Sequence, residues 1–173
     1  MTIRSVSTIA LNLPFEIGGP KPMFAGRPRS GMEMLLLRVE TDQGIVGWGE
    51  AFGFRVWPAT RAAVETLVAP LAIGHDERDI TGLLADLQRK LHLLGRSGPV
   101  IYALSGLDIA LWDIAGKAAG KPVAELLGGA RRKQLPTYAS LMRYTDPAFV
   151  AINATKAISQ GHKAIKLHET GIA

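Results

Sequence analysis

The chain has 173 residues, of which 47% are hydrophobic and 20% are charged, and its net charge is +5. This balance is typical of a globular protein with a buried core, and the absence of cysteine excludes disulfides, thiolate metal sites and a cysteine nucleophile. The basic residues are scattered without a recognition motif, so we expect no nucleic-acid partner. The N-terminal residues alternate apolar and polar side chains, unlike a signal peptide, and we expect a cytoplasmic protein.

The first fifty residues predict an antiparallel β-meander. Residues 3–13, 32–41 and 45–51 have the pattern of strands, and the tight turn "DQG" joins the last two. Between the first two strands, residues 14–31 ("PFEIGGPKPMFAGRPRSG") form a loop rich in Gly and Pro. A loop of this length is typical of a lid, a binding loop or a disordered segment.

Residues 58–95 predict two helices. Pro58 suits a first helical turn, and Pro70 is expected to close the segment that follows. The next helix is expected to begin at Ile80, with Asp79 as its N-cap, and to end at Gly95. Its apolar side chains repeat at helical spacing and predict a buried face: Leu83, Leu87, Leu91 and Leu94.

The stretch 98–120 predicts the longest helix. Its apolar residues recur at steps of four and three, which places them on one stripe: Val100, Leu104, Leu107, Leu111, Ile114 and Ala118. Ile109 and Ala110 lie on the other side, so we expect burial on more than one face. Three charged residues interrupt the stretch: Asp108, Asp113 and Lys117. Each would be costly at a bilayer centre, so we expect a buried helix and no membrane partner.

From residue 135 the pattern becomes strand, helix, strand. The strands are "LPTYASL" (135–141) and "KAIKLHE" (163–169), and the helix between them opens at Asp146 and Pro147 and closes at Gly161. Two strands joined by a helix of this length predict the βαβ unit of a parallel sheet. The fold class is therefore an α+β domain, followed by the beginning of a larger α/β domain.

Lys166 and His168 stand on alternate positions of the last predicted strand. Side chains at i and i+2 point to the same face of a strand, so these two point one way while Ile165 and Leu167 point the other. On spacing alone, this pattern also fits an ordinary solvent-exposed strand face. A functional interpretation of the pair needs support from elsewhere in the sequence.

That support comes from residues 103–128, "ALSGLDIALWDIAGKAAGKPVAELLG". This segment resembles the signature of the mandelate racemase and muconate lactonizing enzyme family of the enolase superfamily. The order of the other parts is similar too: a hairpin with "GWGE", the link "PLAIGHDERDI", a "YAS" strand, and a final strand with Lys-x-His where many members have Lys-x-Lys. The resemblance covers essentially the whole chain.

The resemblance implies a capping domain of three strands and several helices, joined to a modified TIM barrel. Residues 1–130 would be the capping domain, and residues 131–173 the first β-α-β of the barrel. The charged residues of the signature segment would then be scaffold and not catalytic groups: Asp108, Asp113, Lys117 and Lys121.

The chemistry implied by the resemblance is removal of the proton α to a carboxylate, with a divalent metal, usually Mg²⁺, stabilising the enediolate. Lys166 would act mainly by its charge near the substrate carboxylate, and His168 would take the place of the acid/base residue. Histidine is competent there, because its ordinary pKa of about 6.5 leaves a neutral fraction at pH 7. The change from Lys to His at this position leaves the exact reaction open.

Substrate choice in the family depends on two capping loops, which here correspond to residues 14–31 and 52–57. The candidate cations of these loops are Lys21, Arg27, Arg29 and Arg55, and the candidate apolar walls are Phe24, Phe52, Phe54 and Trp57. On the first barrel strand, Tyr138 and Ser140 are candidates to contact the carboxylate of a small acid. Most surface cations have no specific role, so each loop cation could equally be solvated.

The resemblance assigns no metal ligand to this chain, because the family's three acidic ligands lie on later barrel strands. We therefore interpret the chain as a fragment of a longer, homo-oligomeric enzyme, with the remainder of the barrel as its partner. The reaction could be acid-sugar dehydration, racemisation or epimerisation, or cycloisomerisation, and the basic first loop favours dehydration. The alternative is a non-catalytic capping piece that associates through apolar surfaces and is inactive alone.

Overall fold

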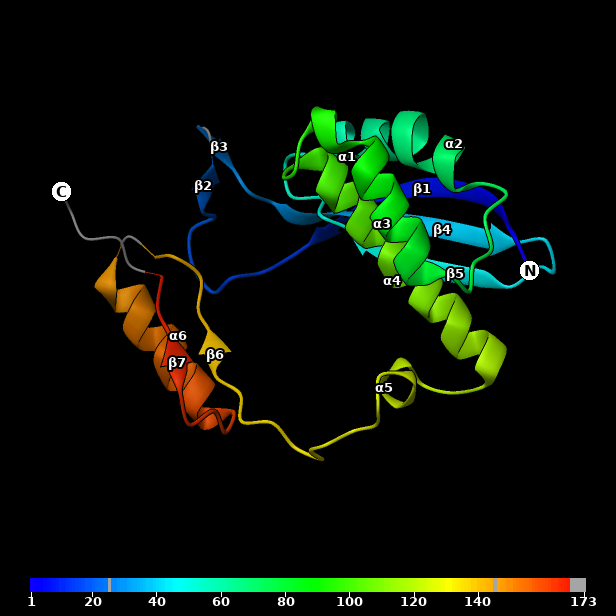
Figure 1. Cartoon of the computed structure of the whole chain (residues 1–173). Coiled ribbons are helices and arrows are strands. Elements are labelled where there is room, and N and C mark those ends of the chain that lie inside the picture. The colour runs from blue at the N-terminus through cyan, green and yellow to red at the C-terminus, as the bar shows by residue number, and fades with distance from the viewer. Residues whose placement is uncertain (25, 145, 169–173) are drawn as a thin grey trace. The chain divides into compact units, whose positions relative to one another are not determined.

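The computed structural model describes residues 1–24, 26–144 and 146–168. The chain divides into two compact units (Figure 1). The first unit comprises residues 1–13 and 32–130, and the second comprises residues 14–31 and 131–173. The sequence predicts that residues 14–31 belong to the capping domain, whereas the contacts of this segment group it with residues 131–173.

The first unit contains a three-stranded sheet in the order β1-β4-β5, formed by β1 (Ile3–Pro14), β4 (Gly31–Thr41) and β5 (Val46–Ala51). β4 and β5 are antiparallel, with Leu35 opposite Ala51 and Glu40 opposite Val46. The predicted meander and its "DQG" turn are confirmed. Alternate residues of β4 are buried on one face of the sheet, as a half-covered strand requires: Leu35, Leu37, Val39 and Thr41.

Helix α4 (Pro99–Ala119) lies against β5 and brings its backbone unusually close to the sheet. A Cβ on Gly47 would be 2.2 Å from the Ala110 carbonyl oxygen, and one on Gly49 would be 2.0 Å from that of Gly106. The two glycines of "GWGE" therefore have a packing reason, because only a residue without a side chain admits this approach.

The predicted stripe of α4 is confirmed for Val100, Leu104, Leu107, Leu111 and Ile114, which are all buried. Ala118 is exposed. The expected burial beyond this stripe is confirmed for Ala110, which is fully buried where the helix meets β5, and is wrong for Ile109, which is 48% exposed. By length and composition alone α4 could cross a membrane, but core helices of globular proteins pass the same test.

Two charged residues of α4 hold the edge of the sheet. The Asp113 carboxylate accepts a hydrogen bond from the Trp48 backbone N–H at 2.8 Å. Lys117 donates to Asp113 at 2.6 Å and to the Val46 carbonyl at 2.8 Å. Asp113 and Lys117 are therefore tied to β5, as expected of scaffold residues.

The helical segment after β5 does not end at Pro70. It runs through α1 (Trp57–Ala63), a π-helical turn (Val64–Val68) and α2 (Ala69–Ala72), with Pro70 in the first turn of α2. In the π turn the Ala69 N–H bonds to the Val64 carbonyl, five residues back. This wider turn precedes Pro70 and accommodates its pyrrolidine ring, which in a regular helix would clash with the carbonyl four residues back.

Helix α3 (Ile80–Lys90) begins as the sequence predicts. The Asp79 carboxylate accepts a hydrogen bond from the Gly82 N–H at 3.0 Å, which confirms the N-cap. After Lys90 a 3₁₀ turn (His92–Leu94) leads to Gly95, whose φ is 121°. Leu94 lies in this turn and is exposed, so the predicted buried face ends at Leu91.

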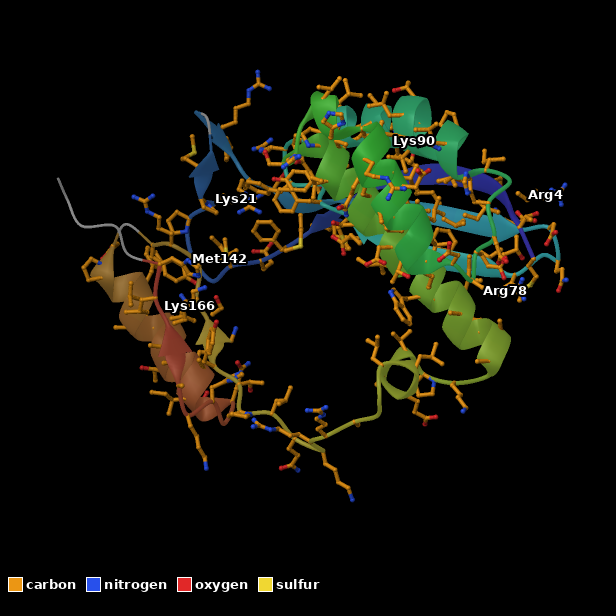
Figure 2. The ribbon with its side chains drawn as sticks, in the orientation of Figure 1. Arg4, Lys21, Arg78, Lys90, Met142 and Lys166 are labelled. Atoms are coloured by element: carbon orange, nitrogen blue, oxygen red, sulfur yellow. The ribbon has the colours of Figure 1, made fainter. Side chains whose placement is uncertain are left out.

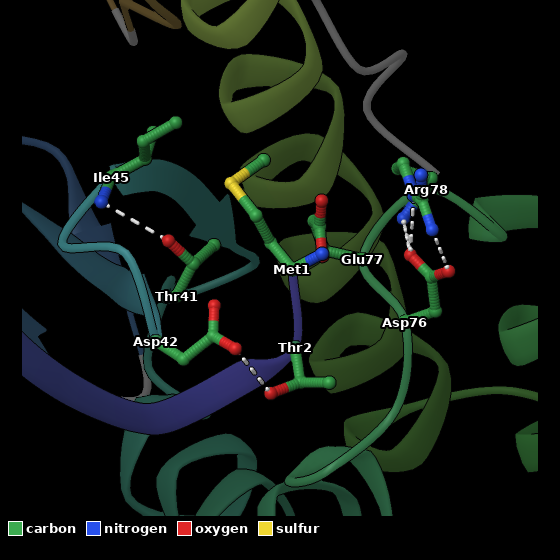
Figure 3. Close-up of polar contacts among 8 residues, drawn as sticks. All are labelled: Met1, Thr2, Thr41, Asp42, Ile45, Asp76, Glu77 and Arg78. Carbon is green, nitrogen blue, oxygen red and sulfur yellow. Dashed lines mark hydrogen bonds and ion pairs between the residues drawn. The ribbon is translucent and has the colours of Figure 1, made fainter.

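Figure 3 shows polar contacts near the N-terminus, in the turn after β4 and in the link before α3. Thr2 donates to Asp42 at 3.1 Å, and Arg78 forms a salt bridge with Asp76 at 2.7 Å. The Arg78 hydrogen bonds hold the pKa of the Asp76 carboxyl well below its ordinary value. Glu77 is buried, with the N-terminal ammonium 3.5 Å away. The first unit is completed by the short helix α5 (Val123–Leu126).

The second unit contains the predicted β-α-β. The parallel strands β6 (Ala139–Ser140) and β7 (Ile165–Lys166) are joined by α6 (Pro147–Ser159). The Asp146 carboxylate accepts a hydrogen bond from the Ala148 N–H at 2.8 Å, which confirms the expected start of the helix. Both strands are shorter than predicted, and residue 169 of the second predicted strand lies outside the described residues.

The segment 14–31 contains a small hairpin, with β2 (Met23–Phe24) antiparallel to β3 (Arg27–Pro28). The Arg29 N–H donates to the Pro22 carbonyl at 2.9 Å and continues the pairing. The predicted loop thus has local structure of its own.

Candidate functional site

Ser140, Lys166 and His168 come together at the ends of β6 and β7. Ser140 pairs with Lys166 in the parallel ladder. The Ser140 hydroxyl lies 3.1 Å from Nε2 of His168, within hydrogen-bond distance. All three side chains are exposed to solvent. The structure therefore brings the two residues predicted to be catalytic together with one of the two predicted on the first barrel strand.

The backbone explains why these side chains meet. The Ala139 N–H donates to the Ala164 carbonyl at 2.9 Å, and the Leu141 N–H donates to the Lys166 carbonyl at 3.0 Å. These bonds fix the register of the two strands on either side of Ser140. Because side chains alternate along a strand, Lys166 and His168 fall on the same side as Ser140.

The three groups have complementary chemistry. Lys166 provides an ammonium that can neutralise a carboxylate or a developing enediolate. The imidazole of His168 can accept a proton when it is neutral, and the hydrogen bond with Ser140 restrains its orientation. The site therefore combines a fixed positive charge, an oriented base and a hydroxyl on one exposed strand face.

The other predicted residues of the second unit lie on both of its chain segments. Tyr138 is exposed and precedes Ser140 by two positions. Lys21 and Arg27 are exposed on the segment 14–31. The Arg29 guanidinium lies over the Phe15 ring, 5.4 Å from its centroid. The side chain of Phe24 lies outside the described part of the structure. Figure 2 labels Lys166, Met142 and Lys21 in this unit.

The second predicted loop, residues 52–57, belongs to the first unit. Phe52 contacts Phe54 and Tyr102, with ring centroids 6.4 and 4.9 Å apart. The Arg61 guanidinium lies 5.1 Å from the Trp57 ring centroid. The structure therefore assigns this loop and the strand site to different units.

Arg55 has a backbone φ of 55°, which is uncommon for a residue with a side chain. Its N–H donates to the Glu33 carboxylate at 2.6 Å, and its guanidinium lies 3.8 Å from the same carboxylate. Glu33 thus holds the loop in an otherwise unfavourable conformation. Sequence reasoning missed Glu33 and Tyr102 as partners of this loop, because neither residue stands in a motif with it.

The described residues do not supply a metal site. No group of three His, Asp or Glu side chains within residues 1–24, 26–144 and 146–168 could hold an ion. Asp42 is engaged by Thr2, and Glu169 lies outside the described residues.

A cavity of about 700 Å³ in the first unit holds none of the predicted site residues. It lies between α3 and α4 and includes Gln88, His92 and Ile101 in its wall. The site is thus defined by the strand ends of the second unit and not by this cavity.

Residues 19–128 match the family described as "Mandelate racemase / muconate lactonizing enzyme, N-terminal domain". The chain belongs to this family. The match contains the whole signature segment 103–128 and leaves Lys166 and His168 beyond its C-terminal limit.

Relatives of this family member agree with the assignment. This chain is 41% identical over 145 residues to a "D-galactonate dehydratase family member" of Catenulispora acidiphila, and the match covers 82% of this chain and 33% of that protein. It is 42% identical over 107 residues to "D-galactarolactone cycloisomerase" of Agrobacterium fabrum, covering 61% of this chain and 27% of that protein. The chain thus spans a third or less of these relatives.

The fold agrees as well. A solved structure of "a member of enolase superfamily" from a Polaromonas species superposes with a TM-score of 0.85 and 33% identity. The superposition covers 99% of this chain and 45% of that chain. This family member therefore has the capping fold of the enolase superfamily, followed by the first β-α-β of an α/β domain.

Proposed function

We propose that this chain is the N-terminal part of an enzyme that removes the proton α to the carboxylate of a small acid. The observation that supports the proposal best is the contact of Ser140 with His168 at 3.1 Å, with Lys166 paired to Ser140 on the neighbouring strand. The groups stand at the C-terminal ends of two parallel strands, where barrel enzymes carry their active sites.

Each residue has a distinct role in the proposed reaction. Lys166 binds the substrate carboxylate and offsets the negative charge that grows on it as the α-proton leaves. His168 accepts this proton at a ring nitrogen, and Ser140 orients the ring through Nε2. With Nε2 bonded to Ser140, the other nitrogen, Nδ1, is the one left to face the substrate.

We favour dehydration of a polyhydroxy acid, with racemisation or epimerisation and cycloisomerisation as the other reactions. One matched relative is a "D-galactonate dehydratase family member", and another is a "D-galactarolactone cycloisomerase". The exposed cations Lys21 and Arg27 suit a substrate with several oxygen groups. Tyr138 and Ser140 remain candidates to contact that substrate, with Phe52, Phe54 and Arg55 as candidates from the other capping loop.

Family membership generally implies a divalent metal, and we propose Mg²⁺, which would stabilise the enediolate when bound. Its ligands would come from the remainder of the barrel, as a partner of this chain. Assembly into a homo-oligomer and a cytoplasmic location complete the proposal. The absence of cysteine is compatible with a reducing compartment.

The test is exchange of the α-proton in heavy water, measured on the longest protein that the gene encodes, with Mg²⁺ and a panel of sugar acids. The wild type is expected to incorporate deuterium, and His168→Asn is expected to lose exchange by about 10²-fold or more while still binding substrate. His162→Asn, in the same unit, is the matched control. Full exchange in His168→Asn would remove His168 from the mechanism.

A second candidate is a non-catalytic association piece, inactive alone. It is favoured by three apolar side chains that are exposed at alternate positions of β1: Ile9, Leu11 and Leu13. Such a row can mark a contact surface. Sedimentation of the 173-residue chain tests this candidate. Self-association that disappears in Leu11→Ser would support an association surface on β1, and a monomer at all concentrations would contradict it.

A further inference from the structure

The short stretch Ile17–Gly19, near the start of the segment 14–31, is held by side chains from the second half of the sequence. The Tyr144 hydroxyl donates a hydrogen bond to the Ile17 carbonyl. The Asn153 amide donates to the Gly18 carbonyl at 3.0 Å and, within its own helix, to the Phe149 carbonyl at 2.9 Å. Two consecutive carbonyls of the segment are thus bound by side chains more than a hundred residues away.

The packing at this point leaves no room for a side chain on Gly18 and little room for one on Gly19. Gly18 has a φ of +71°, and a Cβ there would be 2.2 Å from Oδ1 of Asn153. A Cβ on Gly19 would be 3.2 Å from the Tyr144 ring and 3.3 Å from the Phe149 ring. Glycine therefore suits position 18 because of its positive φ and the lack of space for a Cβ, and it suits position 19 because of the close rings.

Tyr144 and Asn153 are buried in a unit where most polar residues are exposed. Tyr144 is 6% exposed and Asn153 is 9% exposed. Burial raises the pKa of the Tyr144 hydroxyl, so it remains a donor at neutral pH. A buried amide needs its hydrogen bonds satisfied, and the Gly18 carbonyl provides a partner outside α6. We call the contact of Tyr144 and Asn153 with Ile17–Gly19 the anchor.

The anchor follows the first strand of the candidate site along the chain. Tyr144 follows Ser140 by four residues in the loop between β6 and α6, and Asn153 lies on α6 itself. In a parallel β-α-β, this loop leaves from the C-terminal end of the strand, which is where Ser140 stands. Beyond the anchor the segment carries the exposed cations Lys21 and Arg27.

We propose that Tyr144 and Asn153 are positioning residues that fix the base of the segment 14–31 beside the strand site, so that Lys21 and Arg27 contact the same substrate as Lys166 and His168. The anchoring stands on the contacts alone. The effect on substrate rests on the proposed function.

The anchoring is tested on the 173-residue chain by limited proteolysis with endoproteinase Glu-C. The bond Glu16–Ile17 adjoins the anchor, and Glu16 is exposed. Tyr144→Phe removes only the hydroxyl, and Asn153→Ala removes the amide. Each is expected to speed cleavage at Glu16–Ile17 by roughly fivefold or more, as the loss of one buried hydrogen bond implies.

Two controls keep this experiment decisive. Thr155→Ala, exposed on the same helix, is expected to leave the cleavage rate unchanged. Cleavage at Glu125–Leu126, an exposed site in the first unit, serves as the internal reference for protease activity and is expected to stay constant. If Asn153→Ala fails to fold, Tyr144→Phe alone decides. An unchanged ratio of the two cleavage rates in Tyr144→Phe overturns the anchor.

The effect on substrate is tested by kinetics of the full-length enzyme. Tyr144→Phe is expected to raise KM severalfold with a smaller change in kcat, because it weakens substrate positioning and leaves Lys166 and His168 in place. Equal KM values would overturn the positioning role. A wild-type enzyme that exchanges no α-proton would defeat the proposed function, while the cleavage experiment would still decide on the anchor.

Discussion

The two units differ in how their helices are covered. In the first unit α4 buries Leu107, Leu111 and Ile114 completely against the sheet. In the second unit α6 exposes Ile152 by 61% and Ile158 by 63%, and its two buried residues are Asn153 and Ala157. The first unit has a hydrophobic core of its own, whereas the helix of the second unit leaves large apolar side chains exposed. The difference indicates that the second unit is where further structure would pack.

The largest expected effect comes from the core of the first unit. Leu107→Ala is expected to lower the free energy of unfolding by about 2–5 kcal/mol, because it leaves a cavity in a closely packed region. Ile158→Ala, on the exposed face of α6, is expected to change it by less than about 0.5 kcal/mol. Denaturant titration followed by circular dichroism reports on the helices of both units, and tryptophan fluorescence reports on the first unit, which contains all three tryptophans. Equal losses in the two variants would contradict the comparison.

The close approach of α4 to β5 gives the next effect. Gly49→Ala is expected to destabilise the first unit by about 1–3 kcal/mol, because the added Cβ would meet the Gly106 carbonyl at 2.0 Å. Glu50→Ala, exposed on the same strand, is the control and should be close to neutral. The same denaturant titration measures both variants. A neutral Gly49→Ala would mean that the helix can move away from the sheet at little cost.

A smaller effect is expected at the start of α3. Asp79→Ala removes the side chain that accepts the Gly82 N–H and should cost about 1 kcal/mol. Thr81→Ala, exposed in the first turn, is the matched control. Thermal unfolding followed by circular dichroism compares the two. Equal melting temperatures would show that the cap contributes little.

The smallest effect is a dependence on pH. Because Arg78 lowers the pKa of Asp76 in the folded state, this carboxylate stabilises the fold above its unfolded pKa of about 4, and the contribution is lost as the pH falls below that value. Asp76→Asn should therefore flatten the loss of stability in acid. Melting temperatures at pH 7 and pH 3 measure this, and an identical pH slope in the two proteins would contradict it.

The elements that sequence predicted well depend on neighbours along the chain. The Asp79 and Asp146 caps, the turn before Ile45 and the stripe of α4 all follow from residues a few positions apart. The family signature added the arrangement of the strands and the functional interpretation of Lys166 and His168. Spacing alone could not distinguish that interpretation from an ordinary exposed strand face.

The features that sequence reasoning missed depend on contacts between distant segments. The helical segment continues past Pro70 through the π turn that precedes it, and no local sequence pattern predicts such a turn. The reason for Gly47 and Gly49 lies in the backbone of α4, some sixty residues later. The grouping of residues 14–31 with α6 depends on Tyr144 and Asn153, and neither residue stands in a motif.

The assignment of residues 14–31 to the second unit has a consequence for the path of the chain. The chain passes between the two units at residues 13/14, 31/32 and 130/131, so they are joined by three covalent connections. Cutting the connection after residue 130 would not produce two whole units. The N-terminal fragment would keep the segment 14–31 without the helix that holds it, and the C-terminal fragment would lose the segment that covers Tyr144. The chain runs from the first unit into the second, returns to the first, and enters the second again. Neither unit can therefore be separated intact by a single cut.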